Sequence, residues 1–328
     1  MSMNITDIYK YAYVPIEGVP EYVDFEFSLN WVAIYAFITV IYSIPCTVVL
    51  IQLQIFHLKT KKTGGIFNAF VQMQLLITLH GLADFLAVRV PGTGVFTQYC
   101  AAEDPQWYMR SSVFLYYATS YSSQLLTVMF CVMRVVYLYF PAYVQEKFEA
   151  YFNITSLLIT ILSFLVALPH LLSTCVCLQL FRPYPFGALV ILSMFHYGNL
   201  IPFNFSLFVF TSSVMVAILI SAYFMFRKLG ERRKMSVVTK SSYNMKAERT
   251  LSMTILLILI PLIFIQVMSI GEVLNHPLLS YLVLIRPIVD DWRIHIVTQY
   301  FFFTHPALKK QKVSVVSTVS GNAKSVVS

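Results

Sequence analysis

The chain has 328 residues, of which 58% are hydrophobic and 12% charged, and its mean hydropathy is +0.71. This composition excludes a water-soluble globular domain, because too few polar side chains remain to cover its surface. The net charge of +8 does not indicate nucleic-acid binding, because the basic residues flank apolar segments, where membrane insertion and anionic lipid explain them.

Seven long apolar segments follow one another along the chain. Each is close to or beyond the roughly 20 apolar residues that a helix needs to cross a bilayer, and the last is the weakest. Barrel strands are about ten residues long and alternate in polarity, which these segments do not. We therefore expect an all-α membrane protein, a bundle of seven transmembrane helices. The predicted spans are 31–55, 66–88, 111–138, 154–178, 203–226, 251–272 and 284–304.

The distribution of Lys and Arg between the connecting segments predicts the orientation of the chain. The predicted inner segments, above all residues 227–250, hold 17 of the 23 basic residues. We therefore expect an extracellular amino-terminal tail (1–30), a seven-transmembrane domain (31–305) and a cytoplasmic tail (306–328). Of three Asn-x-Ser/Thr sequons, only that of Asn4 is predicted to lie outside and clear of the membrane, so Asn4 is the candidate glycosylation site.

Three of the five cysteines lie in predicted outer segments. Cys100 falls in the first outer loop, and Cys175 and Cys177 fall at the outer end of the fourth span. Because the outside is oxidising, a disulfide from Cys100 to either Cys175 or Cys177 is chemically permitted, and a set of free thiols is the alternative. The spacing does not choose between the two partners.

The third predicted span carries a stripe of aromatic and polar side chains. Tyr117, Tyr121 and Gln124 recur at helical spacing. In a seven-helix bundle the third helix tends to be central, so this stripe predicts the wall of a ligand cavity. Hydrogen bonding between helices is the alternative interpretation.

Charged residues interrupt the seventh segment between positions 286 and 295, and this stretch cannot face lipid. Either the outer loop extends to about residue 288, or the stretch is the water-facing top of the seventh helix. Asp290 and Arg293 are three residues apart, a spacing that allows them to pair on one helix face. Together with Asp291, they are candidates for a structural ion pair or for ligand contacts.

Asp84, in the second span, occupies a local sequence similar to that around the sodium-site aspartate of rhodopsin-like receptors. Its position near the outer end favours another interpretation, in which it faces the bundle interior and pairs with Arg89 or water.

Arg134 ends the third span on the predicted inner side, where rhodopsin-like receptors keep an arginine that contacts a G protein. A membrane anchor is the alternative role for a basic residue at this boundary. Met133 stands where an acidic neighbour is usual, so a restraining ion pair would need another partner, such as Glu248. Arg232 and Arg233, in the basic third inner segment, are further candidates for G-protein contact.

The sequence contains none of the common catalytic motifs. It has no phosphate-binding Walker loop, no Gly-x-Ser-x-Gly and no His-Glu-x-x-His, and its histidines are scattered over different elements. We expect no enzymatic activity, no cofactor and no metal site.

Four stretches of the sequence together are similar to the motifs of one receptor family. They are residues 20–27, Arg134 with Tyr139-Phe140-Pro141, residues 246–251, and Arg286-Pro287 and Asp290 followed by 303–310. Their order and spacing resemble those of the nematode serpentine chemoreceptors, which are G-protein-coupled candidate odorant receptors. Within the gamma superfamily of these receptors the chain looks most like class u. Glu17-Gly18-Val19, where class u members often have His-Gly-Asn, leaves the sister class gamma open.

This resemblance implies a receptor in the ciliary membrane of sensory neurons that signals through a heterotrimeric G protein, and it names no ligand. We expect a small external molecule to bind among helices three, five, six and seven. A seven-span ligand-gated channel or transporter is the alternative; insect odorant receptors have seven helices but an inner amino terminus, which the loop charges here oppose. The ligand-contact candidates are Tyr117, Tyr121, Asp290, Asp291 and Arg293, and the coupling candidates are Arg134, Arg232 and Arg233.

Overall fold

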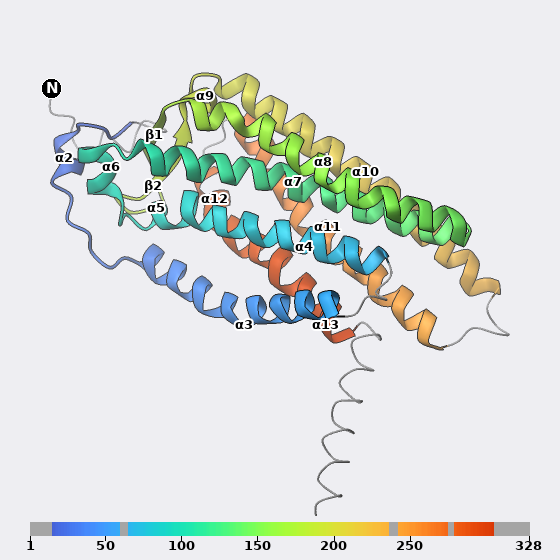
Figure 1. Ribbon diagram of the computed structural model, residues 1–328. Coiled ribbons are helices and arrows are strands. Elements are labelled where there is room, and N and C mark those ends of the chain that lie inside the picture. The colour runs from blue at the N-terminus through green and yellow to red at the C-terminus, as the bar shows by residue number, and fades with distance from the viewer. Residues whose placement is uncertain (1–14, 60–64, 236–241, 275–278, 305–328) are drawn as a thin grey trace, which may run out of the picture.

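The computed structural model describes residues 15–59, 65–235, 242–274 and 279–304. Within these ranges, long helices run side by side in an elongated bundle (Figure 1). A two-stranded hairpin, short helices and the amino-terminal segment cover one end, here called the hairpin end. The other end, which holds the last residues of α10 (Leu200–Met235) and the first residues of α11 (Ser242–Val273), is called the opposite end.

Six helices of the described residues are long and apolar enough to cross a membrane, which confirms that six of the seven predicted segments form long apolar helices. The six helices are α3 (Trp31–Lys59), α4 (Gly65–Asp84) continued by η1 (Phe85–Arg89) and α5 (Val90–Gly92), α7 (Gln106–Tyr139), α8 (Ala142–Leu172), α10 (Leu200–Met235) and α11 (Ser242–Val273). Most of them extend beyond their apolar parts.

The seventh predicted segment forms a continuous helical path in three parts. These are α12 (Leu279–Asp291), a π-helical turn η2 (Trp292–Ile296) and α13 (Val297–Thr304). Its central charged residues keep it below the apolar composition of the other six, so its crossing of the membrane remains a prediction.

The prediction of an entirely helical chain is wrong at the end of the fourth span. The helix α8 ends at Leu172 rather than near residue 178, and an antiparallel hairpin of β1 (Cys175–Gln179) and β2 (Leu189–Ser193) follows it. Cys175 lies opposite Ser193 in the register of this hairpin. A short apolar run of this kind fits a buried strand as well as a helix end, so hydrophobicity alone could not separate the two.

The basic third inner segment, predicted over residues 227–250, is also more helical than expected. Here α10 continues to Met235 and α11 begins at Ser242. Charged, helix-favouring side chains let both helices continue past their apolar parts. The side chains of Arg232, Arg233 and Glu248 lie outside the described residues, as does Asn4.

The distribution of side chains on α8 is the reverse of that in a soluble protein. Leu158, Leu162 and Val166 are exposed, whereas Ser163 and Ala167 are buried against neighbouring helices. Lipid is as apolar as leucine, so membrane helices turn large apolar side chains outward and pack through small residues. This face of the bundle is therefore built to contact lipid.

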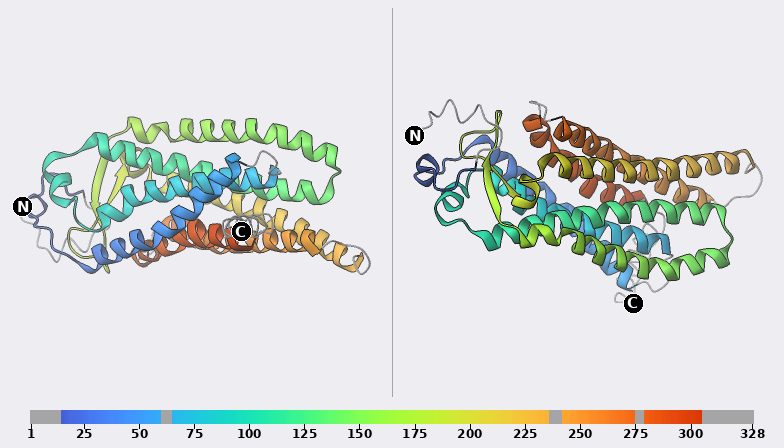
Figure 2. Two further views of the ribbon diagram at one scale, coloured as in Figure 1. Left: turned by 60° about the horizontal axis from the view of Figure 1, so that its bottom comes forward. Right: turned by 90° about the horizontal axis from the view of Figure 1, so that it is seen from above.

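The helix α7 is central in the bundle, as expected of the third span. It packs against α4, α8 and α10 (Figure 2). Toward the opposite end, Phe70 stacks on Phe301 with ring centroids 3.8 Å apart and contacts Phe130 at 5.8 Å. These fully buried rings form the core that closes the bundle on that side.

The amino-terminal segment forms part of the cap at the hairpin end. The backbone N–H of Ile16 donates to the carbonyl of Cys177 (3.1 Å), and Pro15 bridges Leu178, so the segment lies along the free edge of β1. Beyond it, the ring of Tyr22, in α2 (Pro20–Val23), stacks on Phe186 of the hairpin loop. The segment thus covers an edge that would otherwise expose unpaired backbone groups.

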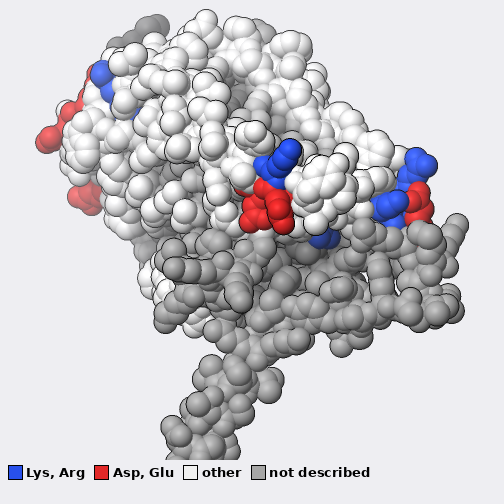
Figure 3. Space-filling model, turned by 45° about the vertical axis from the view of Figure 1, so that its right-hand side comes forward, with Lys and Arg blue, Asp and Glu red and all other residues white. Residues whose placement is uncertain are grey.

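Charged side chains are sparse on the described surface. On the face drawn in Figure 3, Lys, Arg, Asp and Glu gather in a few small groups, and the area between them is free of charge. A surface area without charged side chains is what a hydrocarbon environment requires.

Candidate functional site

A cavity of about 180 Å³ lies inside the bundle beneath the hairpin. Its walls come from α4, η1, α7, α10, α11, α12 and η2, and the strand β2 roofs it. Three of the five predicted ligand residues line it: Tyr117, Asp290 and Arg293. Further polar residues that line it are His80, Tyr116, Gln124, His196, Asn204 and Arg286.

The other two predicted ligand residues do not line the cavity. The half-buried ring of Tyr121 packs edge-on against Phe210 of α10, 5.3 Å between ring centroids. Asp291 points toward α3, where it accepts a hydrogen bond from the hydroxyl of Tyr42. Both contacts hold helices together.

A buried ionic network joins the second helical segment to the seventh. Arg89 donates from Nη1 and Nη2 to the two carboxylate oxygens of Asp291, at 3.0 and 2.9 Å, and from Nε to Asp84 at 2.9 Å. The predicted pairing of Asp84 with Arg89 is therefore present. Such a fork-to-fork contact fixes geometry as well as charge.

Arg286 extends the network toward the cavity. Its Nη2 donates to Asp84 (2.6 Å) and to the hydroxyl of Tyr116, and its Nε donates to Asp290 (3.3 Å). The guanidinium also lies over the ring of Tyr116, 5.0 Å from the centroid. Asp290 therefore pairs with Arg286, not with Arg293 as the sequence spacing suggested. Arg286 lies one α-helical turn before Asp290 on the same face, whereas the π-helical turn η2 changes the angular offset to Arg293.

Arg293 is 3% exposed and has no ion pair among the described residues. Its Nη2 donates to the carbonyl of Ser123 (3.1 Å) and to Oγ1 of Thr127 (2.8 Å), both on α7. Its Nε has no hydrogen-bond partner in the described part of the chain, nor does Oε1 of Gln124. Two residues that line the cavity thus each hold a buried polar atom without a partner in the described part of the chain, a donor on Arg293 and an acceptor on Gln124.

A second polar group lies at the hairpin side of the cavity. The hydroxyl of Tyr117 contacts Nδ1 of His196 (2.9 Å), and Nε2 of His196 contacts Oδ1 of Asn204 (2.9 Å). Because Oδ1 only accepts, Nε2 donates to it, and Nδ1 accepts from Tyr117. The ring of Tyr117 stacks on His170 (4.0 Å), which in turn contacts Ser193 of β2 at 2.6 Å.

Burial lowers the pKa of His196 to about 4, although the hydrogen bond to Asn204 opposes the shift. The imidazole is therefore neutral at pH 7. A neutral His196 keeps the hydrogen-bonded chain of Tyr117, His196 and Asn204 in one fixed arrangement.

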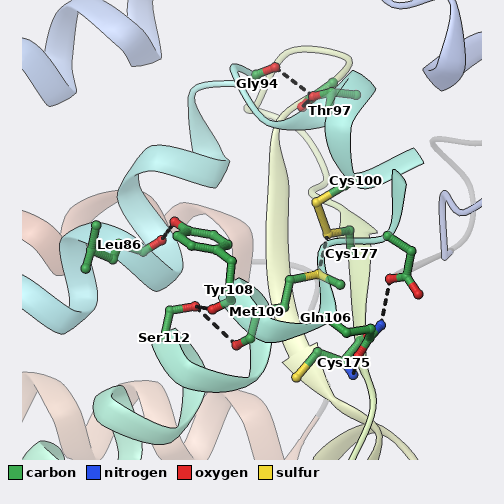
Figure 4. The surroundings of a disulfide bond; sticks show 12 residues. Leu86, Gly94, Thr97, Cys100, Gln106, Tyr108, Met109, Ser112, Cys175 and Cys177 are labelled. Atoms are coloured by element: carbon green, nitrogen blue, oxygen red, sulfur yellow. Dashed lines mark hydrogen bonds between the residues drawn. A yellow bond between two sulfur atoms is a disulfide. The ribbon is translucent and has the colours of Figure 1, made fainter. Parts of the chain in front are cut away.

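The hairpin that roofs the cavity is covalently attached to the neighbouring helix α6 (Thr97–Glu103). A disulfide joins Cys100 of α6 to Cys177 of β1, with Cα atoms 6.3 Å apart (Figure 4). The side chain of Gln106 pairs with the backbone of Cys175 in both directions at 2.9 Å. Cys175 is a free, buried thiol whose pKa burial raises to about 12, so it is chemically inert.

Arg134 lies far from the cavity, near the end of α7. Its side chain is buried, as are Met133 and Val136 beside it. A residue that only anchors a helix extends its charged group to the interface. The burial of Arg134 does not fit a simple anchor.

Sequence reasoning missed several residues that line the cavity. His196 and Asn204 lie near the start of the fifth span, where their spacing along the chain does not indicate a site. Arg286 was noted for the resemblance but not as a site residue. No group of three or more His, Cys, Asp or Glu residues in the described ranges could hold a metal ion. Buried polar groups facing one cavity come from distant segments, and spacing along the chain does not reveal them.

Two comparisons with known proteins bear on this arrangement. The model of the family described as "Serpentine type 7TM GPCR chemoreceptor Sru" matches residues 16–311. The chain is also similar to "Serpentine receptor class U-26" of Caenorhabditis elegans, with 25% identity over 255 residues, which cover 74% of this chain and 86% of that relative. The family match includes every helix that lines the cavity.

Proposed function

We propose, because this chain belongs to the Sru family of serpentine 7TM GPCR chemoreceptors, that it binds an external small molecule in the cavity and signals through a heterotrimeric G protein. Its family and its six apolar helices make it a multi-pass membrane protein and a GPCR-like chemosensory receptor, as the resemblance to class u predicted. The family is one of receptors and not of enzymes.

The proposed topology has seven crossings, with residues 1–30 outside, 31–305 in the membrane domain and 306–328 in the cytoplasm. The excess of Lys and Arg in the predicted inner segments supports this orientation. The hairpin end would then face the outside, where a disulfide between Cys100 and Cys177 is chemically stable. Asn4 would be available for glycosylation. A ciliary location in sensory neurons follows from the family resemblance.

The observation that carries the binding proposal is the set of buried polar groups around one cavity. A ligand pocket is mostly apolar with a few converging polar groups. Here Leu207, Ile265 and Met268 supply apolar wall, and Tyr117, Asp290 and Arg293 supply polar groups. The predicted contacts Tyr121 and Asp291 are reassigned to the packing of helices around this site.

The proposed mechanism couples the cavity to the opposite end through α11. Ile265 and Met268 of α11 line the cavity on one side of Pro261, and the basic segment that precedes α11 lies on the other. Proline removes a backbone hydrogen bond, so Pro261 is the proposed hinge. A ligand shifts the equilibrium only by its differential affinity for the two positions of α11. Arg134, Arg232 and Arg233 would then contact the G protein.

A cell-based G-protein dissociation assay tests the proposal. Cells expressing the full chain, with surface expression measured, are exposed to a panel of small molecules. We expect at least one compound to activate a G protein, and Arg134→Ala to abolish the response without loss of surface expression. A matched variant, Arg227→Ala, removes an exposed charge of the same type from α10 and should retain the response. A ligand-gated ion current without G-protein activation would contradict the proposal and favour a channel.

A further inference from the structure

The unused polar atoms around the cavity restrict the chemistry of the molecule that fits there. Arg293 Nε is a donor and Gln124 Oε1 is an acceptor, and neither has a partner in the described part of the chain. Both side chains are at least nine-tenths buried, at 3% and 5% exposed, and both line the cavity. A ligand that leaves either atom unpaired forfeits affinity, because buried polar groups are costly without a partner.

The side chain of Arg293 lies against the segment of α7 that carries Gln124. Arg293 is held by Ser123 and Thr127, which stand one residue before and three residues after Gln124 on α7. The amide nitrogen of Gln124 is already used, since it donates to Ser120 at 3.3 Å. That bond uses one of the two N–H groups, and the amide oxygen of Gln124 is the atom that has no partner among the described residues.

The charges of this region are already balanced. Three carboxylates (Asp84, Asp290, Asp291) accompany three guanidinium groups (Arg89, Arg286, Arg293), and all but Arg286 are more than nine-tenths buried. A ligand with a net charge would leave that charge uncompensated in a region of low dielectric, which is expensive. Charge balance therefore favours a neutral ligand.

We propose that the cavity selects a small neutral carboxamide, with its carbonyl accepting from Arg293 Nε and its N–H donating to Gln124 Oε1. This inference rests on the proposed function, because it names the ligand class of the same site. An amide presents an acceptor and a donor side by side without a charge, whereas a carboxylate has no donor and an ammonium has no acceptor.

The volume of the cavity limits the rest of the ligand. Drug-sized pockets measure about 300–1,000 Å³, and a cavity of about 150 Å³ accommodates benzene. About 180 Å³ therefore admits one ring or a short chain besides the amide. Leu207, Ile265 and Met268 offer the apolar wall against which such a body packs.

Binding to the purified full chain in lipid nanodiscs tests this inference. The probes are two size-matched sets: benzamide, benzoate, benzylammonium and benzyl alcohol, and pentanamide, pentanoate, pentylammonium and pentanol. Affinity is measured at pH 7 by competition or by the shift in thermal unfolding. We expect the amide of each set to bind at least tenfold more tightly than the acid and the amine. Tightest binding of the acid, the amine or the alcohol, or no binding of either amide, would overturn the inference.

Variants separate recognition from folding. Gln124→Leu should weaken amide binding about tenfold, the usual effect of one lost hydrogen bond. Gln124→Glu adds a negative charge and should shift the preference toward the ammonium probes, a gain that a purely structural role for Gln124 would not produce. Arg227→Gln, at an exposed position on α10, is the matched control and should keep the preference for the amide. An unchanged preference in Gln124→Glu would overturn the inference.

The failure of this inference is distinguishable from that of the proposed function. Tight binding of an acid, amine or alcohol with G-protein activation in cells would leave the receptor proposal intact and remove only the amide assignment. Amide binding without activation of any G protein would support the amide assignment and contradict the receptor proposal.

Discussion

Arg89 and Asp291, 202 residues apart in sequence, form a two-point contact in which Nη1 and Nη2 of the guanidinium donate to both carboxylate oxygens. The contact ties the end of the second helical segment to the turn where α12 passes into η2. Tyr42 of α3 donates to the same carboxylate. Three helices of the bundle therefore meet at Asp291, next to the cavity but outside its lining.

Breaking this contact from one side should destabilise the protein strongly. Asp291→Asn leaves the charge of Arg89 partly uncompensated, and removing one partner of a buried pair typically costs about 3–5 kcal/mol. We expect a clearly lower midpoint of thermal unfolding for the purified receptor. Glu231→Gln, which breaks the exposed pairs of Glu231 with Arg227 and Lys228, is the control and should leave the midpoint unchanged. Equal effects of the two substitutions would show that the buried network does not stabilise the bundle.

The disulfide predicts opposite outcomes for two neighbouring cysteines. Cys177→Ser opens a bridge between residues 77 positions apart, and loop-closure entropy for a loop of that length is worth about 4 kcal/mol. We expect low surface expression and a lower unfolding midpoint. Cys175→Ser keeps the bridge, and its thiol is free in the structure, so it should be tolerated. Non-reducing peptide mapping checks the pairing, and a peptide that links Cys100 to Cys175 would refute it.

Acidification should destabilise the protein partly through His196. Burial lowers its pKa from 6.5 to about 4. Between these values the unfolded chain binds a proton that the folded chain excludes, so the free energy of unfolding falls as the pH falls from about 6.5 to 4. The full effect is about 3 kcal/mol, and it levels off below pH 4. Thermal unfolding from pH 7.5 to 4.5 should therefore depend less steeply on pH in His196→Gln, and identical slopes would contradict this.

Two glycines with left-handed backbone conformations should differ in their tolerance of alanine. Gly187 has φ +89°, and a Cβ added there would collide with the ring of Phe25, whereas Gly18 has φ +67° and open space around it. Both changes impose backbone strain of about 1 kcal/mol, but only Gly187→Ala also displaces a packed ring. We expect Gly187→Ala to lower the unfolding midpoint more than Gly18→Ala does. The reverse order would show that Phe25 does not pack on the hairpin loop.

The long helices were predictable because length and hydrophobicity alone decide whether a segment can cross a bilayer. The third helix was expected at the centre, and Tyr117, Asp290 and Arg293 were expected near a ligand. The hairpin after α8 was not predicted, because a buried strand and a helix end carry the same apolar signal. The first and sixth spans form continuous helices, although they contain Pro45 and Pro261. A single proline does not end a membrane helix that packs against neighbouring helices.

The partners of the charged residues were harder to predict than their location. The sequence indicated that residues 286–295 could not face lipid. It did not indicate that Asp290 would pair with Arg286, or that Arg293 would instead donate hydrogen bonds to α7. This pairing depends on the π-helical turn after Asp291, and the sequence of Trp292–Ile296 contains no feature that predicts such a turn. His196 and Asn204 line the cavity beside Tyr117. The hydrogen bond between Tyr117 and His196 links residues that are 79 positions apart in sequence. Tertiary packing sets such contacts, and residue spacing does not.

The accessibility of residues 10 and 240 tests the receptor account most directly. An epitope tag is inserted at one of these positions in each of two otherwise identical receptors, and antibody is applied to intact and to permeabilised cells. The account predicts that the tag at 10 is labelled on intact cells, and that the tag at 240 is labelled only after permeabilisation. Labelling of both tags on the same face of the membrane, or of the tag at 240 alone on intact cells, would contradict it.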